Sequence, residues 1–114
     1  MMRARPSLRV FGLGAFAATF FVVAAAPVCS AEVIHVRVKN LVYTPAQVSA
    51  HVGDTIEWSN DDFIVHTATA QDKSWEVMLP AHAKGRKVMT KAGTFDYFCR
   101  LHPNMKGKIT VTEK

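Results

Sequence analysis

The chain has 114 residues and a formal net charge of +5 at pH 7, and this length fits one domain. A domain of this size buries a modest core and leaves little room for a large substrate cavity. Three of the positive charges are arginines before residue 10, so residues 32–114 carry eleven basic against nine acidic residues, a net charge of +2, which argues against nucleic-acid binding.

The first 31 residues have the three parts of a secretory signal peptide. The early arginines are followed by an uncharged stretch from Val10 to Ala26, and Cys29-Ser30-Ala31 offers a cleavage site of small residues. We therefore expect residues 1–31 to be a signal peptide and residues 32–114 to be the exported domain. An uncleaved anchor is the alternative, but a 17-residue run with two glycines is marginal for crossing about 30 Å of hydrocarbon.

Short predicted strands follow one another through residues 32–114. Apolar side chains alternate with polar ones over residues 32–39, which is typical of a strand with one buried face. Turn sequences such as Gly53-Asp54 separate the later runs. The expected strands are 32–39, 47–52, 55–59, 63–70, 75–79, 86–90, 94–99 and 107–112. Because no segment has a convincing helical period, we expect an all-β fold, a β-sandwich of two stacked sheets.

The strand expected at residues 94–99 ends in a cysteine. Cys99 shares one face with Phe95 and Tyr97, so its thiol should point into the core. Removal of the signal peptide would also remove Cys29 and leave Cys99 as the one cysteine of the exported domain. A single cysteine cannot form an internal disulfide, and an exposed free thiol is a liability in an oxidising compartment. A metal ligand is therefore the better interpretation of Cys99.

Three further residues complete a set of metal ligands with Cys99. His102 and Met105 follow it with the spacing Cys-x-x-His-x-x-Met, and His66 lies in the strand expected at residues 63–70. Two histidines, one cysteine and a weakly bound methionine are the ligands of a mononuclear blue-copper electron-transfer centre. Zinc is the main rival for the histidine and cysteine ligands, but its structural sites seldom include a thioether. The pattern predicts one copper ion.

Other histidines and methionines are weaker candidates. Met78 and Met89 are alternatives for the axial position, but neither lies on a short tether to Cys99. Asp61-Asp62 resembles a pair of catalytic carboxylates, yet turn residues explain it. The remaining histidines, which we expect at the surface, are His35, His51 and His82.

Two segments resemble the cupredoxin family. The first is Gly-Asp-Thr-Ile-Glu-Trp-Ser-Asn at residues 53–60, with His66 six residues further on. The second is Ala-Gly-Thr-Phe-Asp-Tyr-Phe-Cys-Arg-Leu-His-Pro-Asn-Met-Lys-Gly at residues 92–107. The two residues between the histidine and the methionine of that motif are similar to the amicyanin branch of the family. The resemblance covers nearly all of residues 40–112.

The resemblance implies an eight-strand Greek-key sandwich with copper at one end. It assigns His66, Cys99 and His102 as the strong equatorial ligands and Met105 as the axial ligand. It makes Asn60 and Thr67 candidates for hydrogen bonds to the sulfur. The loop carrying His102 and Met105 is expected to lead into the last strand.

The resemblance also implies that the His102 imidazole reaches the surface through an apolar patch and serves as the electron port. The apolar residues expected there are Ile64, Val65, Met78, Leu79, Leu101 and Pro103. The basic residues expected around them are Arg100, Lys106 and Lys108.

These residues predict a periplasmic, monomeric one-electron carrier that exchanges electrons with a dehydrogenase or a c-type cytochrome. We expect no nucleic-acid partner and no membrane association after signal cleavage. We do not expect an enzyme, because Phe98 and Arg100 flank Cys99 where copper oxidases place relay histidines, and no acid partner or cavity for a hydrolase is evident. The alternative is a protein that sequesters or delivers copper with the same ligands, although residues 32–114 lack Met-rich or His-rich ends.

Overall fold

The computed structural model describes residues 2–4, 6, 7, 12, 14–23 and 30–114. The expected signal peptide therefore lies partly outside the described residues, including Cys29. The described residues before Val33 belong to no helix or strand. Nowhere in the described part of the chain is there a helix with the length and apolar character needed to span a membrane.

Nine strands are assigned between residues 30 and 114, and no helix is assigned there. They are β1 (Val33–Lys39), β2 (Val42–Thr44), β3 (Gln47–His51), β4 (Thr55–Asn60), β5 (His66–Ala70), β6 (Glu76–Leu79), β7 (Lys84–Val88), β8 (Gly93–Cys99) and β9 (His102–Thr112).

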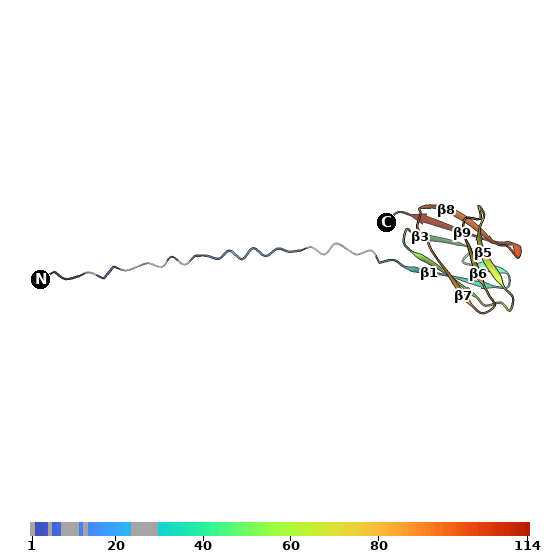
Figure 1. Ribbon diagram of the computed structural model, residues 1–114, viewed down its shortest axis with the longest axis horizontal. Helices are drawn as coiled ribbons and strands as arrows, with labels where there is room; N and C mark the ends of the chain where they lie inside the picture. Colours follow the sequence, from blue (N-terminus) through green and yellow to red (C-terminus); the bar gives the residue numbers. More distant parts are fainter. Residues whose placement is uncertain (1, 5, 8–11, 13, 24–29) are drawn as a thin grey trace.

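The strands form two mixed sheets (Figure 1). One sheet has the order β2-β1-β4-β7 and the other the order β3-β9-β8-β5-β6. The pairs β1–β4 and β3–β9 are parallel, and the other pairs are antiparallel. The expected all-β fold with two sheets is confirmed.

Large aromatic side chains join the two sheets in the core. Trp58 of β4 is fully buried, and its Nε1 donates a hydrogen bond to the hydroxyl of Tyr97 on β8 over 3.3 Å. Tyr43 of β2 packs edge-to-face on Tyr97, with ring centroids 4.8 Å apart. Gly107 of β9 lies opposite Tyr97, and a Cβ there would run into that ring. The core is therefore built from the inward faces of both sheets.

The predicted alternation holds where one face of a strand is buried. On β1, Val36 and Val38 are buried while the residues between and after them, Arg37 and Lys39, are exposed. On β8, Tyr97 and Cys99 are buried, as expected for the face that carries the thiol. This face fixes where the ligand strand points.

Three features of the fold differ from the expectation. Strand β2 was not expected, and it pairs with β1 just before Pro45. Residues 63–65 lie outside β5, which begins at His66. Strand β9 begins at His102 rather than near Gly107, so His102 and Met105 lie in a strand and not on a connecting loop. The reason is a two-residue turn, residues 100–101, after which Cys99 and His102 face each other as partners.

Candidate metal centre

Antiparallel pairing gathers three ligand candidates at one end of the five-stranded sheet. Cys99 is the last residue of β8, and His102 is the first residue of β9. His66 is the first residue of β5, which runs antiparallel to β8. The start of β5 and the start of β9 must therefore lie beside the end of β8.

The donor atoms of these three residues converge. His66 Nδ1 lies 3.2 Å from His102 Nδ1, and Cys99 Sγ lies 3.7 Å from each of them. Metal bonds of about 2.0–2.1 Å to nitrogen and about 2.3 Å to sulfur would separate such donors by roughly 3.3–3.8 Å for angles between tetrahedral and trigonal. The side chains therefore fit a single ion with a thiolate and two imidazoles.

The cluster is shielded on most sides. His66 and Cys99 are fully buried, whereas His102 is half-buried. Of the three, His102 is the side chain in contact with solvent.

Met105 is buried on β9, three residues after His102. Its assignment as the axial ligand remains a prediction. The two alternatives are placed less well. Met78 is nearly half exposed on β6. The backbone of Met89 is hydrogen-bonded to Asp54, which precedes the first residue of β4, whereas the metal centre lies near the other end of that strand.

Asp62 fixes the orientation of the His66 ring. Its Oδ2 lies 2.7 Å from His66 Nε2, which leaves Nδ1 directed at Cys99. The same carboxylate accepts backbone N–H groups from Asn40 and Leu41. Burial opposes the charge of Asp62, but these hydrogen bonds and the one from His66 outweigh it and lower its pKa. A carboxylate that holds the second nitrogen of a ligand histidine sets its tautomer.

The turn interpretation of Asp61-Asp62 therefore missed a site residue. Asp62 stands four residues before His66, but an aspartate in a turn sequence is too common to reveal this contact. Its backbone partners on residues 40 and 41 depend on a register that the local sequence does not encode.

Thr67 supplies the hydrogen bond to the sulfur. Its backbone N–H donates to Cys99 Sγ over 3.3 Å. Its carbonyl oxygen accepts from the hydroxyl of Tyr43, and burial raises the pKa of Tyr43 and so keeps that hydroxyl protonated. The expectation for Thr67 is met through its backbone, because the antiparallel pairing of β5 with β8 brings the N–H of residue 67 to the end of β8.

Asn60 has a different role from the one expected. Its Nδ2 donates to the carbonyl oxygens of Ile64 and Leu79, both over 2.9 Å, and its Oδ1 accepts the backbone N–H of Asp62. Asn60 therefore braces the loop that leads into His66. Among the printed contacts of its side chain, all partners are backbone groups of residues 62–80 rather than the sulfur.

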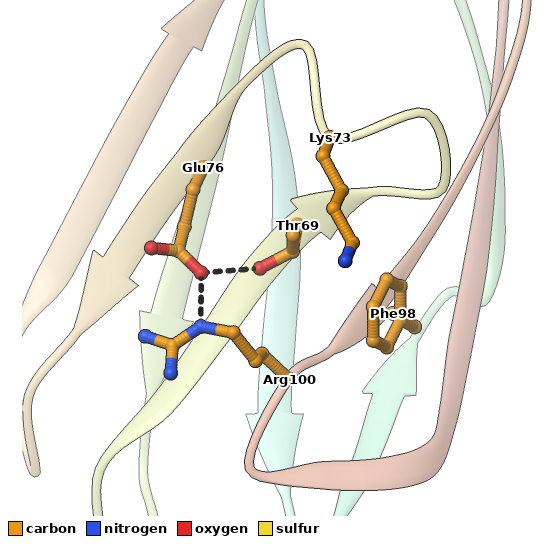
Figure 2. Close-up of a pocket in the computed structure, with 5 residues that line it drawn as sticks. All are labelled: Thr69, Lys73, Glu76, Phe98 and Arg100. Atoms are coloured by element: carbon orange, nitrogen blue, oxygen red, sulfur yellow. Dashed lines mark hydrogen bonds and ion pairs between the residues drawn. The ribbon is translucent and has the colours of Figure 1, made fainter.

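A hydrogen-bond chain runs from Thr67 to the surface. Thr67 Oγ1 accepts the backbone N–H of Arg100 and contacts Thr69 Oγ1, each over 2.9 Å. Figure 2 shows the next links, in which one oxygen of Glu76 accepts from both the Thr69 hydroxyl, over 2.8 Å, and Arg100 Nε, over 2.7 Å. Hydrogen bonds from Arg100 and Thr69 lower the pKa of Glu76. The chain ties the turn after Cys99 to strand β6.

The surface around His102 matches the expectation in part. Ile64, Val65, Met78 and Leu101 are exposed, but Leu79 is fully buried and belongs to the core. Arg100 is paired with Glu76, and Lys108 lies 3.9 Å from Asp96. Of the three basic residues expected around His102, Arg100 and Lys108 each lie near a carboxylate. Lys106 is exposed and is the nearest lysine to His102 in the sequence.

Comparisons with known proteins agree with this arrangement. A family model described as a cupredoxin-like domain matches residues 12–111. Amicyanin from Paracoccus denitrificans is 30% identical over 115 residues, which cover 91% of this chain and 88% of that protein. Amicyanin from Paracoccus versutus is 27% identical over 124 residues, 94% of each chain. Plastocyanin from Scenedesmus fuscus is 35% identical over 86 residues, 62% of this chain and 87% of the relative.

Solved structures of amicyanin are also similar to this chain. An oxidized mutant of amicyanin superposes with a TM-score of 0.63 at 27% identity, over 68% of this chain and 80% of that one. A Cu(I) form of another amicyanin mutant gives a TM-score of 0.62 at 29% identity, over 69% and 81%.

Proposed function

The chain belongs to the cupredoxin-like family, as an amicyanin-like member, and we propose that it is a one-electron carrier with one type 1 copper ion. The observation that carries the proposal is the convergence of His66 Nδ1, His102 Nδ1 and Cys99 Sγ within 4.8 Å of one another at one end of the sandwich. Soft sulfur and imidazole in this combination suit copper in both oxidation states.

In this proposal His66, Cys99 and His102 are the strong ligands, and Met105 is the weak axial one. Bound copper supplies a centre that takes up and releases one electron. The protein holds the donors fixed, because two of them are buried and all three are set by strand pairing. Asp62 and Thr67 position the imidazole and the sulfur. When the donor atoms hardly move as the charge of the centre changes, the reorganisation energy of electron transfer is small.

His102 is proposed as the point of contact with redox partners. It is half-buried while the other two donors are fully buried. Exposed apolar side chains precede both imidazoles in the chain, namely Leu101 before His102, and Ile64 and Val65 before His66. An exposed apolar surface of this kind suits a brief encounter with a protein partner.

We propose that the carrier acts in the periplasm after cleavage of residues 1–31, with residues 32–114 forming the mature, monomeric cupredoxin domain. The basic start, the apolar stretch and the small-residue cleavage site support export. The partners in this proposal are a periplasmic dehydrogenase and a c-type cytochrome. No membrane or nucleic acid is part of it, and electron carriage rather than enzymatic turnover is the role.

The test is spectroscopic and kinetic. Protein loaded with Cu(II) should be intensely blue through thiolate-to-copper charge transfer, and it should exchange electrons reversibly with a c-type cytochrome. Cys99→Ser should abolish the colour, while the control Met89→Leu should keep it. A colourless wild-type protein with Cu(II) would contradict the copper site. Rapid transfer of copper to a chelating acceptor without electron exchange would instead support the alternative role in copper sequestration or delivery.

A further inference from the structure

The parallel register of β1 and β4 places two residues side by side at the far end of the sandwich from Cys99. Val33 of β1 is opposite Thr55 of β4, so Glu32 and Asp54, which precede them, are neighbours. The backbone N–H of Glu32 donates to Asp54 Oδ1, and the N–H of Thr55 donates to the carbonyl oxygen of Glu32, both over 2.9 Å. The first peptide of β1 is therefore anchored on the Asp54 carboxylate.

The Asp54 side chain is a buried anion. It is 2% exposed, and its second oxygen accepts the backbone N–H of His51 over 2.7 Å. The hydrogen bonds from Glu32 and His51 lower the pKa of Asp54. One of its oxygens is thus satisfied by the turn between β3 and β4, and the other is directed at the nitrogen of Glu32.

Glu32 is also the first residue after the expected cleavage site. Residues 30–32 are exposed, and β1 begins immediately afterwards at Val33. A cut between Ala31 and Glu32 would therefore leave the sheet complete while changing the chemistry of the Glu32 nitrogen, which contacts Asp54 Oδ1.

We propose that hydrolysis of the Ala31–Glu32 bond creates an α-ammonium group on Glu32 that forms an ion pair with Asp54 and anchors the mature N-terminus. The inference rests on the export step of the proposed function and not on copper. In the hydrolysis, the oxygen of one water goes to the new Ala31 carboxylate, and the two protons of that water go to the Glu32 nitrogen, so that the peptide bond becomes a carboxylate and an ammonium group. A hydrogen bond from a neutral amide to the Asp54 carboxylate thereby becomes an ion pair in which both partners are charged.

The ion pair makes stability depend on pH in a stated direction. An α-amino group has an ordinary pKa of about 7.7–8.0, and the Asp54 carboxylate raises it in the folded state. The stabilisation is fully present below the ordinary pKa and is lost as pH rises through the raised one. Besides the Glu32 nitrogen, the charged groups that act on the Asp54 carboxylate are His51 and Lys114. Both groups are the same in the natural product and in the glycine-inserted product described below, so the difference between their pH curves isolates the amine.

The experiment uses the full chain with its own leader, exported by a bacterial host. Mass and N-terminal sequence of the product should give Glu32 as the first residue. Urea unfolding of the metal-free product should then show a folding equilibrium constant that falls about tenfold from pH 7 to pH 9.5, because one unit of pKa shift is a tenfold change. In a precursor with one glycine inserted between Ala31 and Glu32, this extra tenfold fall should be absent, and every other titrating group is the same in the two products.

Two substitutions complete the cycle. Asp54→Asn should remove the difference between the inserted and natural forms, whereas the exposed carboxylate control Asp96→Asn should preserve it. Should Asp54→Asn fail to fold, the comparison of natural and inserted forms decides alone. A product starting at another residue overturns the proposed processing, and identical pH curves for the natural and inserted forms overturn the ion pair. Blue colour on adding Cu(II) tests the copper site separately in each product.

Discussion

Arg100 Nε donates a hydrogen bond to Glu76 Oε1 over 2.7 Å, so a cation one residue from Cys99 is already committed to a carboxylate on β6. The contact joins the turn before His102 to an edge strand of the same sheet. It also separates the roles of two basic residues that flank His102 in the sequence. Arg100 supports the turn, whereas Lys106 presents its charge to solvent.

Docking should depend on Lys106 more than on Arg100. Lys106→Glu should slow electron exchange with an acidic partner at low salt on the order of several-fold, because a charge at the rim acts on the encounter rate. The difference should vanish as salt shortens the Debye length to about 8 Å near 0.15 M. Stopped-flow rates across a salt series measure it. Lys91→Glu, at the other end of β8, is the matched control, and equal slowing by both variants would rule out a local rim.

Met105→Gln should lower the reduction potential and keep copper bound. A thioether favours Cu(I) more than an amide oxygen does, and the three other ligands carry most of the affinity. Voltammetry of the purified protein measures the shift. Met89→Leu changes a buried methionine away from the site and should leave the potential unchanged. An unshifted potential in Met105→Gln would mean that another group holds the axial position.

Asp62→Asn should weaken metal binding by about 10- to 100-fold, because loss of the carboxylate behind a ligand histidine has this typical cost. The amide cannot accept the N–H groups of Asn40 and Leu41 and also hold His66 Nε2 as the carboxylate does. Competition with a chelator of known affinity gives the value. Asp61→Asn is the control, since Asp61 pairs with Arg37 instead. Equal affinity in the two variants would remove Asp62 from the site.

Glu76 should make a small contribution to acid stability. Its pKa is lowered by hydrogen bonds from Arg100 and Thr69, so the stabilisation is present above the ordinary pKa of about 4.3 and is lost as pH falls through the lowered value. Because both partners are partly exposed, the effect should be about fivefold or less in the folding equilibrium constant. Urea unfolding at pH 7 and pH 3 should show Glu76→Gln closer to wild type at pH 3. A constant difference would contradict this assignment.

The local sequence predicts the parts of the site that depend on strand periodicity and on short chain spacing. Strand period alone places the Cys99 thiol on the buried face, and chain spacing alone brings His102 near it. Glu76 was not foreseen, because its partner lies at a sequence separation that only strand pairing closes. Asp62 was not foreseen although His66 is only four residues away, because its turn sequence already explains it and its backbone partners, Asn40 and Leu41, are distant in the chain. Glu76 meets Arg100 across 24 residues, and Thr67 meets Cys99 across 32.

The strand that carries His102 shows a second limit. Pro103 argues for a loop, because proline cannot donate to a ladder. Strand β3, however, pairs with β9 only over residues 108–112 of β9, so that side of the strand has no partner at Pro103. The missing N–H therefore costs nothing there, and the strand extends to His102.

His66 and His102 are 36 residues apart in the chain and meet only when β5 and β9 have both assembled against β8. The unfolded polypeptide thus offers at best the donors of the short segment from Cys99 to Met105 and lacks the second imidazole, and the affinity of the finished site is coupled to folding. A chain that crosses a membrane unfolded would arrive without its ion. The compartment in which the sheets assemble would then decide, through its own supply of metals, which ion the protein captures.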